Sequence, residues 1–303
     1  MSEAVSNESD LPAARDPRWS TLVLWAALAF LAQELNVAIG RWVELPPPGT
    51  PLGHAVSIGW TLVVLALLVQ GALAGARLVQ PAWLLVGVGT VAAGPVLVRV
   101  AGIYLSDGPA RPAALPALVT PIAVNFLGPL GLTLVGVGLA RGVRHANLLL
   151  VAAAAAMFFD LVIVTAGTVA ALRERAPEAI AQASLGAGTA AAPDELGPEP
   201  LSGVTIGPAD VLFLAFFLGA VVRLRLAERA TSIWLVCLLG VGIVAVEVGS
   251  IALPALLPMG LAVVIVNASH ARFTPAERRA LVAGAALAAL IGAMIVIGAA
   301  SWL

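Results

Sequence analysis

Apolar residues fill the chain in long runs, separated by short polar or glycine- and proline-rich stretches. Each run is about 20 residues long, the length that an α-helix needs to cross the hydrocarbon core of a bilayer. The pattern predicts an all-α fold, a polytopic membrane helix bundle of about nine transmembrane helices. These helices are expected at residues 19–39, 54–76, 82–105, 114–140, 146–172, 207–224, 231–249, 251–268 and 281–302. Only a turn near Ser250 separates the seventh from the eighth, so eight or ten spans also fit the pattern.

The polar stretches divide the chain into a tail, one membrane domain and one long loop. Residues 1–18 form a polar N-terminal tail, and residues 19–303 form a single transmembrane domain. Residues 173–206 are rich in alanine, glycine, proline and acidic residues, a composition that predicts a mobile loop. β-Branched residues at 202–206 favour a short extended strand at the end of this loop.

The composition supports a membrane protein and excludes an ordinary soluble domain. Hydrophobic residues make up 60% of the 303 positions and charged residues 11%, and the mean hydropathy is +1.01. The net charge of −1 gives no signal for nucleic-acid binding, and the composition leaves the oligomeric state open. The single cysteine, Cys237, can form neither an intramolecular disulfide nor a thiolate metal cluster.

Arginine placement predicts the orientation of the helices in the cell membrane. All sixteen basic residues are arginine, and with nine spans eleven of them fall on one side, four on the other, and Arg99 within the third span. Because cytoplasmic loops are enriched in positive residues, we expect the N-terminus in the cytoplasm and the 173–206 loop outside. The larger group is Arg15, Arg18, Arg77, Arg141, Arg144, Arg223, Arg225, Arg229, Arg272, Arg278 and Arg279. The smaller group is Arg41, Arg111, Arg173 and Arg175.

Two aspartates lie inside apolar runs that are consecutive in the chain. Asp160 lies within the fifth predicted helix, and Asp210 lies near the start of the sixth. A carboxylate at the centre of a bilayer costs about 2.5–3.5 kcal/mol on insertion scales. Both residues are therefore candidates for a functional site.

If the two carboxylates face each other, they can act as one acid–base pair. Like charges at close range cannot both ionise easily, so such a pair holds one proton. The ionised member takes a proton from a water that attacks a peptide carbonyl. The protonated member donates to the developing oxyanion and then helps the amine to leave. This chemistry needs no metal, no cofactor and no nucleophilic side chain, but it needs water at membrane depth.

Three short motifs around these aspartates identify a known family by resemblance. They are Phe159-Asp160 before the polar loop, Gly207-Pro208-Ala209-Asp210 at the start of the next run, and Pro254-Ala255-Leu256 one span later. In this order they resemble the Tyr-Asp, Gly-x-Gly-Asp and Pro-Ala-Leu motifs of presenilin and signal peptide peptidase, the intramembrane aspartyl proteases. The resemblance covers about residues 145 to 268.

This resemblance implies a presenilin-like fold and a protease. Residues 19–145 would supply N-terminal helices, residues 146–268 the catalytic core, and residues 281–302 a C-terminal helix. Asp160 and Asp210 would be the catalytic pair. The substrates would be transmembrane segments or signal peptides of other proteins, and a substrate strand would pair with the chain just before the second motif. The residues implied to shape the site are Phe159, Gly207, Ala209, Pro254, Ala255 and Leu256.

The chain departs from the family in its motifs and in its helix count. Phe159 stands where the family has tyrosine, so a hydroxyl is missing beside the site. Ala209 stands at the second glycine, and its Cβ restricts a close backbone approach. Four predicted spans precede Asp160 where the family has five, and one extra span follows Pro-Ala-Leu. The predicted orientation resembles that of signal peptide peptidase, so substrates are expected to have their N-terminus inside.

Other polar residues in the apolar runs leave two alternatives open. Glu34 or Glu247 could pair with Arg99, or could join a proton path with the two aspartates. In the second case the chain is a proton- or ion-coupled transporter or channel. A third possibility is a catalytically weak member of the protease fold that only binds membrane helices. The three histidines, at the edges of spans, show no metal-ligand spacing and are expected at the surface.

Overall fold

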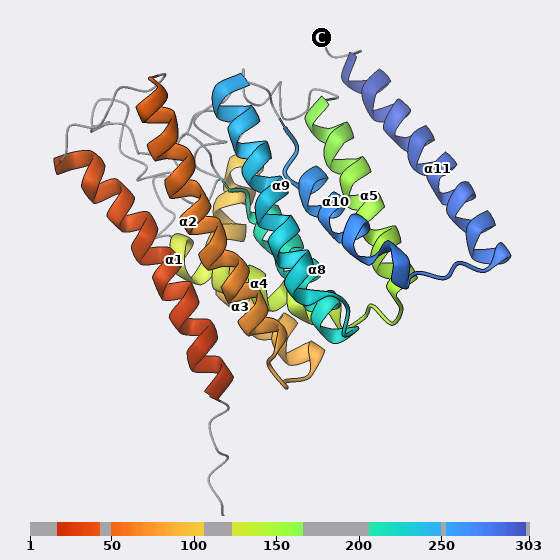
Figure 1. Cartoon of the computed structure of the whole chain (residues 1–303), viewed down its shortest axis with the longest axis horizontal. Helices are drawn as coiled ribbons and strands as arrows, with labels where there is room; N and C mark the ends of the chain where they lie inside the picture. Colours follow the sequence, from red (N-terminus) through yellow and green to blue (C-terminus); the bar gives the residue numbers. More distant parts are fainter. Residues whose placement is uncertain (1–16, 43–49, 106–122, 166–205, 250–252, 301–303) are drawn as a thin grey trace, which may run out of the picture.

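The structure is a computed structural model that describes residues 17–42, 50–105, 123–165, 206–249 and 253–300. The regular elements in these ranges are all helices, which confirms the all-α prediction, and Ile206 alone takes part in a β-bridge. The helices pack side by side in a bundle (Figure 1). Their bounds are α1 Pro17–Trp42, α2 Pro51–Ala76, α3 Ala82–Leu105, α4 Gly128–Ala140, α5 Ala146–Thr165, α8 Pro208–Arg223, α9 Glu228–Gly249, α10 Leu256–Asn267 and α11 Pro275–Ala300. A π-helical turn, Ala123–Leu127, leads into α4, and a 3-10 turn, Ala268–His270, follows α10.

Each predicted helical range overlaps one of these helices. Among the described residues, three helices are long and apolar enough to cross a membrane: Pro51–Ala76, Ala146–Val164 and Glu228–Val248. The chain is therefore a helical bundle with helices of membrane-spanning length, as expected of a membrane protein. The number of spans remains a prediction. The tail up to residue 16 and residues 173–205 of the predicted loop lie outside the described residues.

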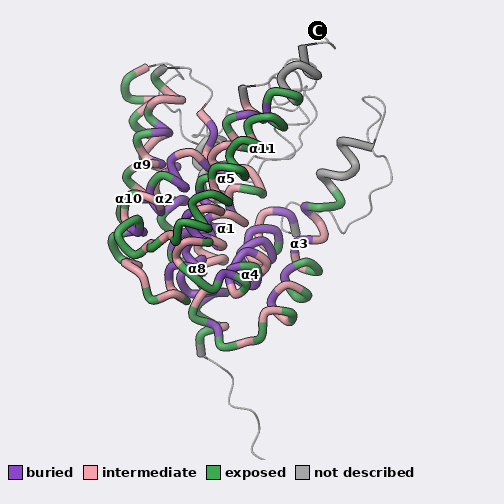
Figure 2. Tube along the Cα trace, turned by 90° about the vertical axis from the view of Figure 1, so that its right-hand side faces the viewer, coloured by how far each residue is buried: buried purple, intermediate pink, exposed green. Residues whose placement is uncertain are grey.

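Helices α4 and α8 form the buried centre of the bundle (Figure 2). A Cβ added at Gly136 in α4 would lie 2.9 Å from the Cβ of Ala215 and 3.0 Å from the backbone nitrogen of Phe216. A Cβ added at Gly219 in α8 would lie 2.9 Å from the Cβ of Ala140. Gly136 of α4 faces Ala215 of α8, and Ala140, one turn later, faces Gly219, also one turn later. The two helices therefore run parallel and end side by side. The innermost residues of α8 are Ala215, Phe217, Leu218, Ala220 and Val221, all fully buried.

A second set of glycines brings α3 against another face of α4. A Cβ at Gly89 would lie 2.7 Å from the carbonyl oxygen of Gly131, and one at Gly138 would lie 3.2 Å from the backbone nitrogen of Val86. The later residue of α3, Gly89, faces the earlier residue of α4, Gly131, and the earlier residue, Val86, faces the later one, Gly138. Helices α3 and α4 are therefore antiparallel. Small residues allow such close approach between helices in a bilayer, where packing replaces the hydrophobic effect as the driving force.

Arginines tie the helix ends together at one end of the bundle. Arg18 donates from Nη1 to the carbonyl oxygen of Arg77 at 2.7 Å, and Arg141 donates from Nη2 to the carbonyl oxygen of Leu78 at 2.5 Å. Arg77 itself pairs with Glu228 at the start of α9. The loop after α2 is thus held from α1, α4 and α9. These arginines belong to the group predicted on the cytoplasmic side, and the orientation remains a prediction.

Helix α11 stands at the edge of the bundle, beside α5 (Figure 1). Its start is anchored by Asn147, which donates to the carbonyl oxygen of Arg272 and accepts from the Arg272 amide, both at 2.9 Å. Thr274 and Glu277 cap the first turn by exchanging hydrogen bonds between side chain and backbone. Beyond this turn the helix is largely exposed, and Gly292 is its one buried position among the residues whose burial is described.

The close contact between α4 and α8 can be tested by adding a methyl group where the two helices touch. We expect Gly136→Ala to lower the free energy of unfolding by about 1–3 kcal/mol, because the new methyl group meets backbone rather than a flexible side chain. Gly87→Ala in α3 is the matched control, since a Cβ there meets nothing within 4 Å. Thermal unfolding of both variants in detergent measures the difference. Equal midpoints would show that α4 and α8 are not packed this closely.

Candidate active site

Helix α5 presents Asp160 to helix α10. Ala153, Met157 and Asp160 are spaced by four and three residues, which places them on one face of α5. A Cβ added at Gly260 of α10 would lie 2.9 Å from the Met157 sulfur and 3.0 Å from the Ala153 carbonyl oxygen. The absence of a side chain at Gly260 therefore lets α10 lie directly against the aspartate-bearing face of α5.

The carboxylate of Asp160 accepts a hydrogen bond from the first turn of α10. The amide of Leu256 donates to Oδ2 of Asp160 at 2.7 Å. Leu256 is the first residue of α10, so its N–H has no partner within its own helix. The N-terminal end of a helix also carries a partial positive charge that favours a carboxylate. Asp160 thus caps α10 from a different helix, and each group satisfies the other.

The rest of the Pro-Ala-Leu segment sets the start of α10. Pro254 is buried, and its carbonyl oxygen accepts from the amide of Leu257 at 3.3 Å. Ala255 is the residue that precedes the helix. Leu256 is buried, with 7% of its surface exposed. The three residues therefore place the backbone N–H of Leu256 at Asp160. Because this contact is made by the backbone, the pattern of side chains in the sequence could not predict it.

Asp210 lies in the first turn of α8 and is held by its own helix end. The Gly207 amide donates to Oδ2 of Asp210 at 2.8 Å, the arrangement of an N3 acid that caps its helix. A Cβ at position 207 would lie only 3.1 Å from that same oxygen. The glycine thus leaves room for the carboxylate. Pro208 begins the helix, where its missing N–H costs no hydrogen bond.

The helices that carry the two aspartates are in contact. Helix α5, which carries Asp160, contacts α8, which carries Asp210, and α10 contacts both of them. Each aspartate uses Oδ2 to accept a backbone amide, and no described residue donates to either Oδ1. The arrangement leaves one oxygen of each aspartate available to a water or to a substrate carbonyl.

The two positions that depart from the family motifs lie beside the aspartates in sequence. Phe159 is 37% exposed, and its ring packs edge-on against Phe158 with centroids 5.6 Å apart. Ala209 is exposed on the first turn of α8. Phe158 lies on the opposite face of α5 from Asp160, because it packs against Gly292 of α11. What either departure does to substrate binding remains a prediction.

The acid in α9 forms a separate cluster with α2. Ser57 donates from Oγ to Oε1 of Glu247 at 2.6 Å, and His54 Nδ1 lies 3.5 Å from Oε2 of Glu247. His54 is partly exposed, with 27% of its side-chain surface accessible, and its contact with the Glu247 carboxylate was not expected. Its place at the end of a span did not reveal that a carboxylate from a distant helix lies beside it. Within the described ranges, no hydrogen bond or ion pair joins Glu247 to either aspartate.

Two residues of the site were missed by sequence reasoning. Met157 and Gly260 form the close contact of α5 with α10. Gly260 follows Leu256 by four residues, one helical turn, and this spacing could have suggested a shared face. Met157 carried no signal, since a methionine in an apolar helix is unremarkable. Within the described residues, no group of three His, Cys, Asp or Glu could hold a metal ion.

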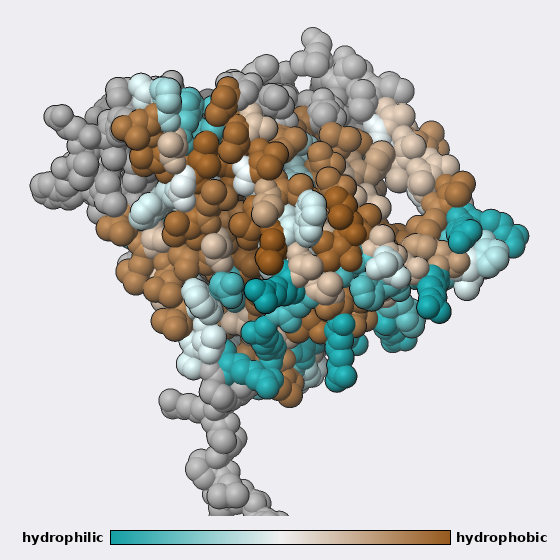
Figure 3. All heavy atoms as spheres, viewed as in Figure 1, coloured by the Kyte–Doolittle hydropathy of each residue, from teal (hydrophilic) through white to brown (hydrophobic). Residues whose placement is uncertain are grey.

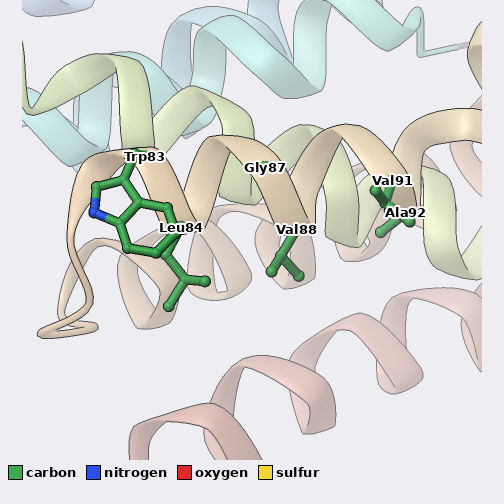
Figure 4. Close-up of a pocket in the computed structure, with 6 residues that line it drawn as sticks. All are labelled: Trp83, Leu84, Gly87, Val88, Val91 and Ala92. Atoms are coloured by element: carbon green, nitrogen blue, oxygen red, sulfur yellow. The ribbon is translucent and has the colours of Figure 1, made fainter.

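A hollow on the outer face of α3 lies away from this chemistry. It is apolar, and all its lining residues come from α3, which carries neither aspartate (Figure 4). Trp83 at one end is 75% exposed and Val91 near the other is 80% exposed. An exposed apolar helix face of this kind suits contact with lipid.

The capping role of Asp210 gives a stability test. Asp210→Asn keeps an oxygen that can accept from the Gly207 amide, whereas Asp210→Ala removes it. We expect the alanine variant to be less stable than the asparagine variant by about 1 kcal/mol, the usual value of a helix cap. Thermal or denaturant unfolding in detergent measures the difference. If both variants unfold at the same point, the hydrogen bond makes no contribution.

Comparison with protein families, with curated proteins and with solved structures finds no match to this chain. The site therefore rests on its own geometry and chemistry.

Proposed function

We propose that this protein is an intramembrane aspartyl endopeptidase in which Asp160 and Asp210 form the catalytic pair. The observation that carries the proposal is the mutual contact of the three helices that bear the motifs. Asp160 of α5 accepts the Leu256 amide at the start of α10, and α8, whose first turn carries Asp210, contacts both α5 and α10. These are the three segments whose sequences resemble the motifs of presenilin and signal peptide peptidase.

The geometry suits a water-activated mechanism. Both carboxylates are fixed through Oδ2 by backbone amides, so their positions do not depend on flexible side chains. The ionised member removes a proton from a water as the water attacks the substrate carbonyl. The protonated member gives its proton to the carbonyl oxygen, so that a neutral gem-diol forms. The first aspartate then passes the proton it took from water to the leaving amine, and the second takes a proton back from a gem-diol hydroxyl as the C–N bond breaks. The pair therefore ends the cycle with one proton, as it began.

The chain next to Asp210 suits an extended substrate. Gly207 has φ −72° and ψ 154°, an extended conformation, and Ile206 before it takes part in a β-bridge. A helical substrate must open its backbone before a peptide bond can be attacked, and strand addition offers partners for the opened groups. Residues 202–205 of the predicted strand lie outside the described residues.

The proposed substrates are transmembrane segments or signal peptides of other proteins in the cell membrane. With the N-terminus in the cytoplasm, α5 runs outward and α8 returns. Substrates then enter with their N-terminus inside. No metal or cofactor takes part in this scheme.

The transporter alternative would use Glu247 together with the two aspartates. Glu247 is engaged instead with Ser57 and His54 of α2. This contact supports a structural role for Glu247 in joining α2 to α9. The protease proposal is therefore preferred, and Glu247 serves as a control in its test.

The catalytic pair is tested with isosteric variants. Asp160→Asn and Asp210→Asn each keep an oxygen for the backbone amide but remove the carboxylate. We expect each variant to cleave a model transmembrane substrate at least about 100-fold more slowly, the usual contribution of a general acid or base. Initial rates in liposomes measure this, with unfolding midpoints recorded for the same preparations.

Glu247→Gln is the matched control and should keep the wild-type cleavage rate. If a correctly folded Asp160→Asn or Asp210→Asn variant cleaves at the wild-type rate, the proposal is wrong. An absence of cleavage by wild type, together with proton-coupled uptake that needs the aspartates, would favour the transporter.

The α5–α10 contact should matter to the rate as well as to the fold. Gly260→Ala pushes α10 away from Met157 and Ala153 and so draws the Leu256 amide away from Asp160. We expect the cleavage rate at saturating substrate to fall about tenfold or more, since small misplacements of catalytic groups cost that much. Gly284→Ala in α11, where a Cβ meets nothing within 4 Å, should cleave as wild type does. An unchanged rate in Gly260→Ala would show that the position of α10 does not govern catalysis.

A further inference from the structure

One end of the bundle carries a large excess of positive charge. Figure 3 shows hydrophilic residues gathered along this lower edge, below a broad apolar surface. Ten described arginines belong to it, against two described carboxylates, Glu228 and Glu277. The arginines are Arg18, Arg77, Arg141, Arg144, Arg223, Arg225, Arg229, Arg272, Arg278 and Arg279.

Both of these carboxylates are already engaged. Glu228 pairs with Arg77. Glu277 accepts from the amide of Thr274 at 2.7 Å and lies within 3.4 Å of the Asn147 side chain, and these bonds lower the pKa of Glu277. The remaining positive charge is therefore not balanced by acids of the described chain.

The excess is concentrated where α4 and α8 end side by side. Arg141 directly follows Ala140, and Arg223 lies one turn beyond Gly219, which packs against Ala140. Arg141 and Arg223 thus lie at adjoining helix ends, and no carboxylate of the described residues forms an ion pair with either of them. Burial lowers the pKa of Arg141, and the charge of Arg223 lowers it further. A bound anion at these helix ends would offset the repulsion between Arg141 and Arg223.

A structural explanation accounts for part of this arrangement. Arginine is favoured at the C-terminal end of a helix, where the dipole supplies about half a negative charge. Arg141 also donates to the carbonyl oxygen of Leu78. Two helix ends together offset only about one of the two positive charges, and Arg225 adds a third close by. A net positive charge remains at the ends of these helices.

Arg225 occupies a backbone position that favours glycine. It has φ 52°, and the amides of Arg225 and Leu226 donate to the carbonyl oxygens of Val222 and Val221. This is a Schellman motif with arginine at the left-handed position. A residue with a Cβ pays a conformational cost there that glycine avoids. The cost is explained if the exposed guanidinium at this helix end has a partner outside the chain.

The position of this end relative to a bilayer indicates the partner. Trp83 at the start of α3 is 75% exposed, and Trp234 in the second turn of α9 is 44% exposed. Exposed tryptophans at the boundary of an apolar surface mark the headgroup level of a membrane. Guanidinium groups at that level meet lipid phosphates, which they bind well because of their forked geometry.

We propose that the adjacent ends of α4 and α8 bind the headgroup phosphate of an anionic phospholipid, through Arg141 and Arg223 with Arg225 beside them. The lipid would neutralise the paired guanidinium groups and fix the ends of the two central helices. This binding is independent of proteolysis.

The test measures stabilisation by lipids of stated composition. The full chain in mixed micelles is titrated with phosphatidylglycerol or phosphatidylcholine, and the unfolding midpoint is followed. We expect phosphatidylglycerol to raise the midpoint and phosphatidylcholine not to. Arg223→Gln should need about fivefold more phosphatidylglycerol for the half-maximal shift, the effect of about one surface arginine. Arg223 has no described hydrogen-bond partner, so the variant is expected to fold.

Arg278→Gln removes the same charge from the same end of the bundle, on α11, and should titrate as wild type does. An equal loss in both variants would overturn the proposal, since it would indicate diffuse attraction. Equal stabilisation by the two lipids would overturn it as well. Inorganic phosphate, added with phosphatidylcholine, should give no shift. A shift as large as that of phosphatidylglycerol would mean a site for a free anion rather than for a lipid.

Discussion

The hydrogen bond from the Leu256 amide to Asp160 is the contact on which the site depends. A carboxylate in an apolar helix is costly unless it is paired, and a helix end has amides that its own backbone cannot satisfy. Here the free Leu256 amide donates to the Asp160 carboxylate, so one hydrogen bond satisfies both groups. The bond also joins the start of α10 to α5, so a polar contact adds to the packing of the two helices.

Close helix packing makes that bond possible. Gly260 brings α10 against α5, and Gly136 and Gly219 bring α4 against α8, whose first turn carries Asp210. In a bilayer such approaches supply most of the association energy, because apolar surface gains little by leaving lipid. The aspartates are thus placed by residues that have no side chain. This explains why the site is assembled from three helices without a continuous network of polar groups between them.

The sequence predicted the helices well because their apolar runs are long. It singled out the two aspartates as candidates because ionisable groups stand out in such runs, and their role stays a prediction. The π-helical turn Ala123–Leu127 at the start of the fourth helix was not predicted, and residues 114–122 of its run lie outside the described residues. Contacts between distant helices were not predictable from local pattern. The approach of Gly260 to Met157 and the pairing of Glu247 with His54 and Ser57 depend on tertiary packing. The contact between α5 and α8 agrees with the hypothesis of facing helices, and the pairing of the Asp160 and Asp210 carboxylates stays a prediction.

The central claim is that Asp160 and Asp210 belong to one site, and proximity measured in the membrane tests it most directly. Cysteines at both positions, in a Cys237→Ala background, are treated with a short bifunctional thiol reagent. Mass spectrometry then detects the bridged peptides. Cysteines at 158 and 210 form the control, because Phe158 lies on the opposite face of α5, against Gly292. The account predicts bridging of 160 to 210 and none of 158 to 210. Bridging of the control pair alone, or of neither pair, would contradict it.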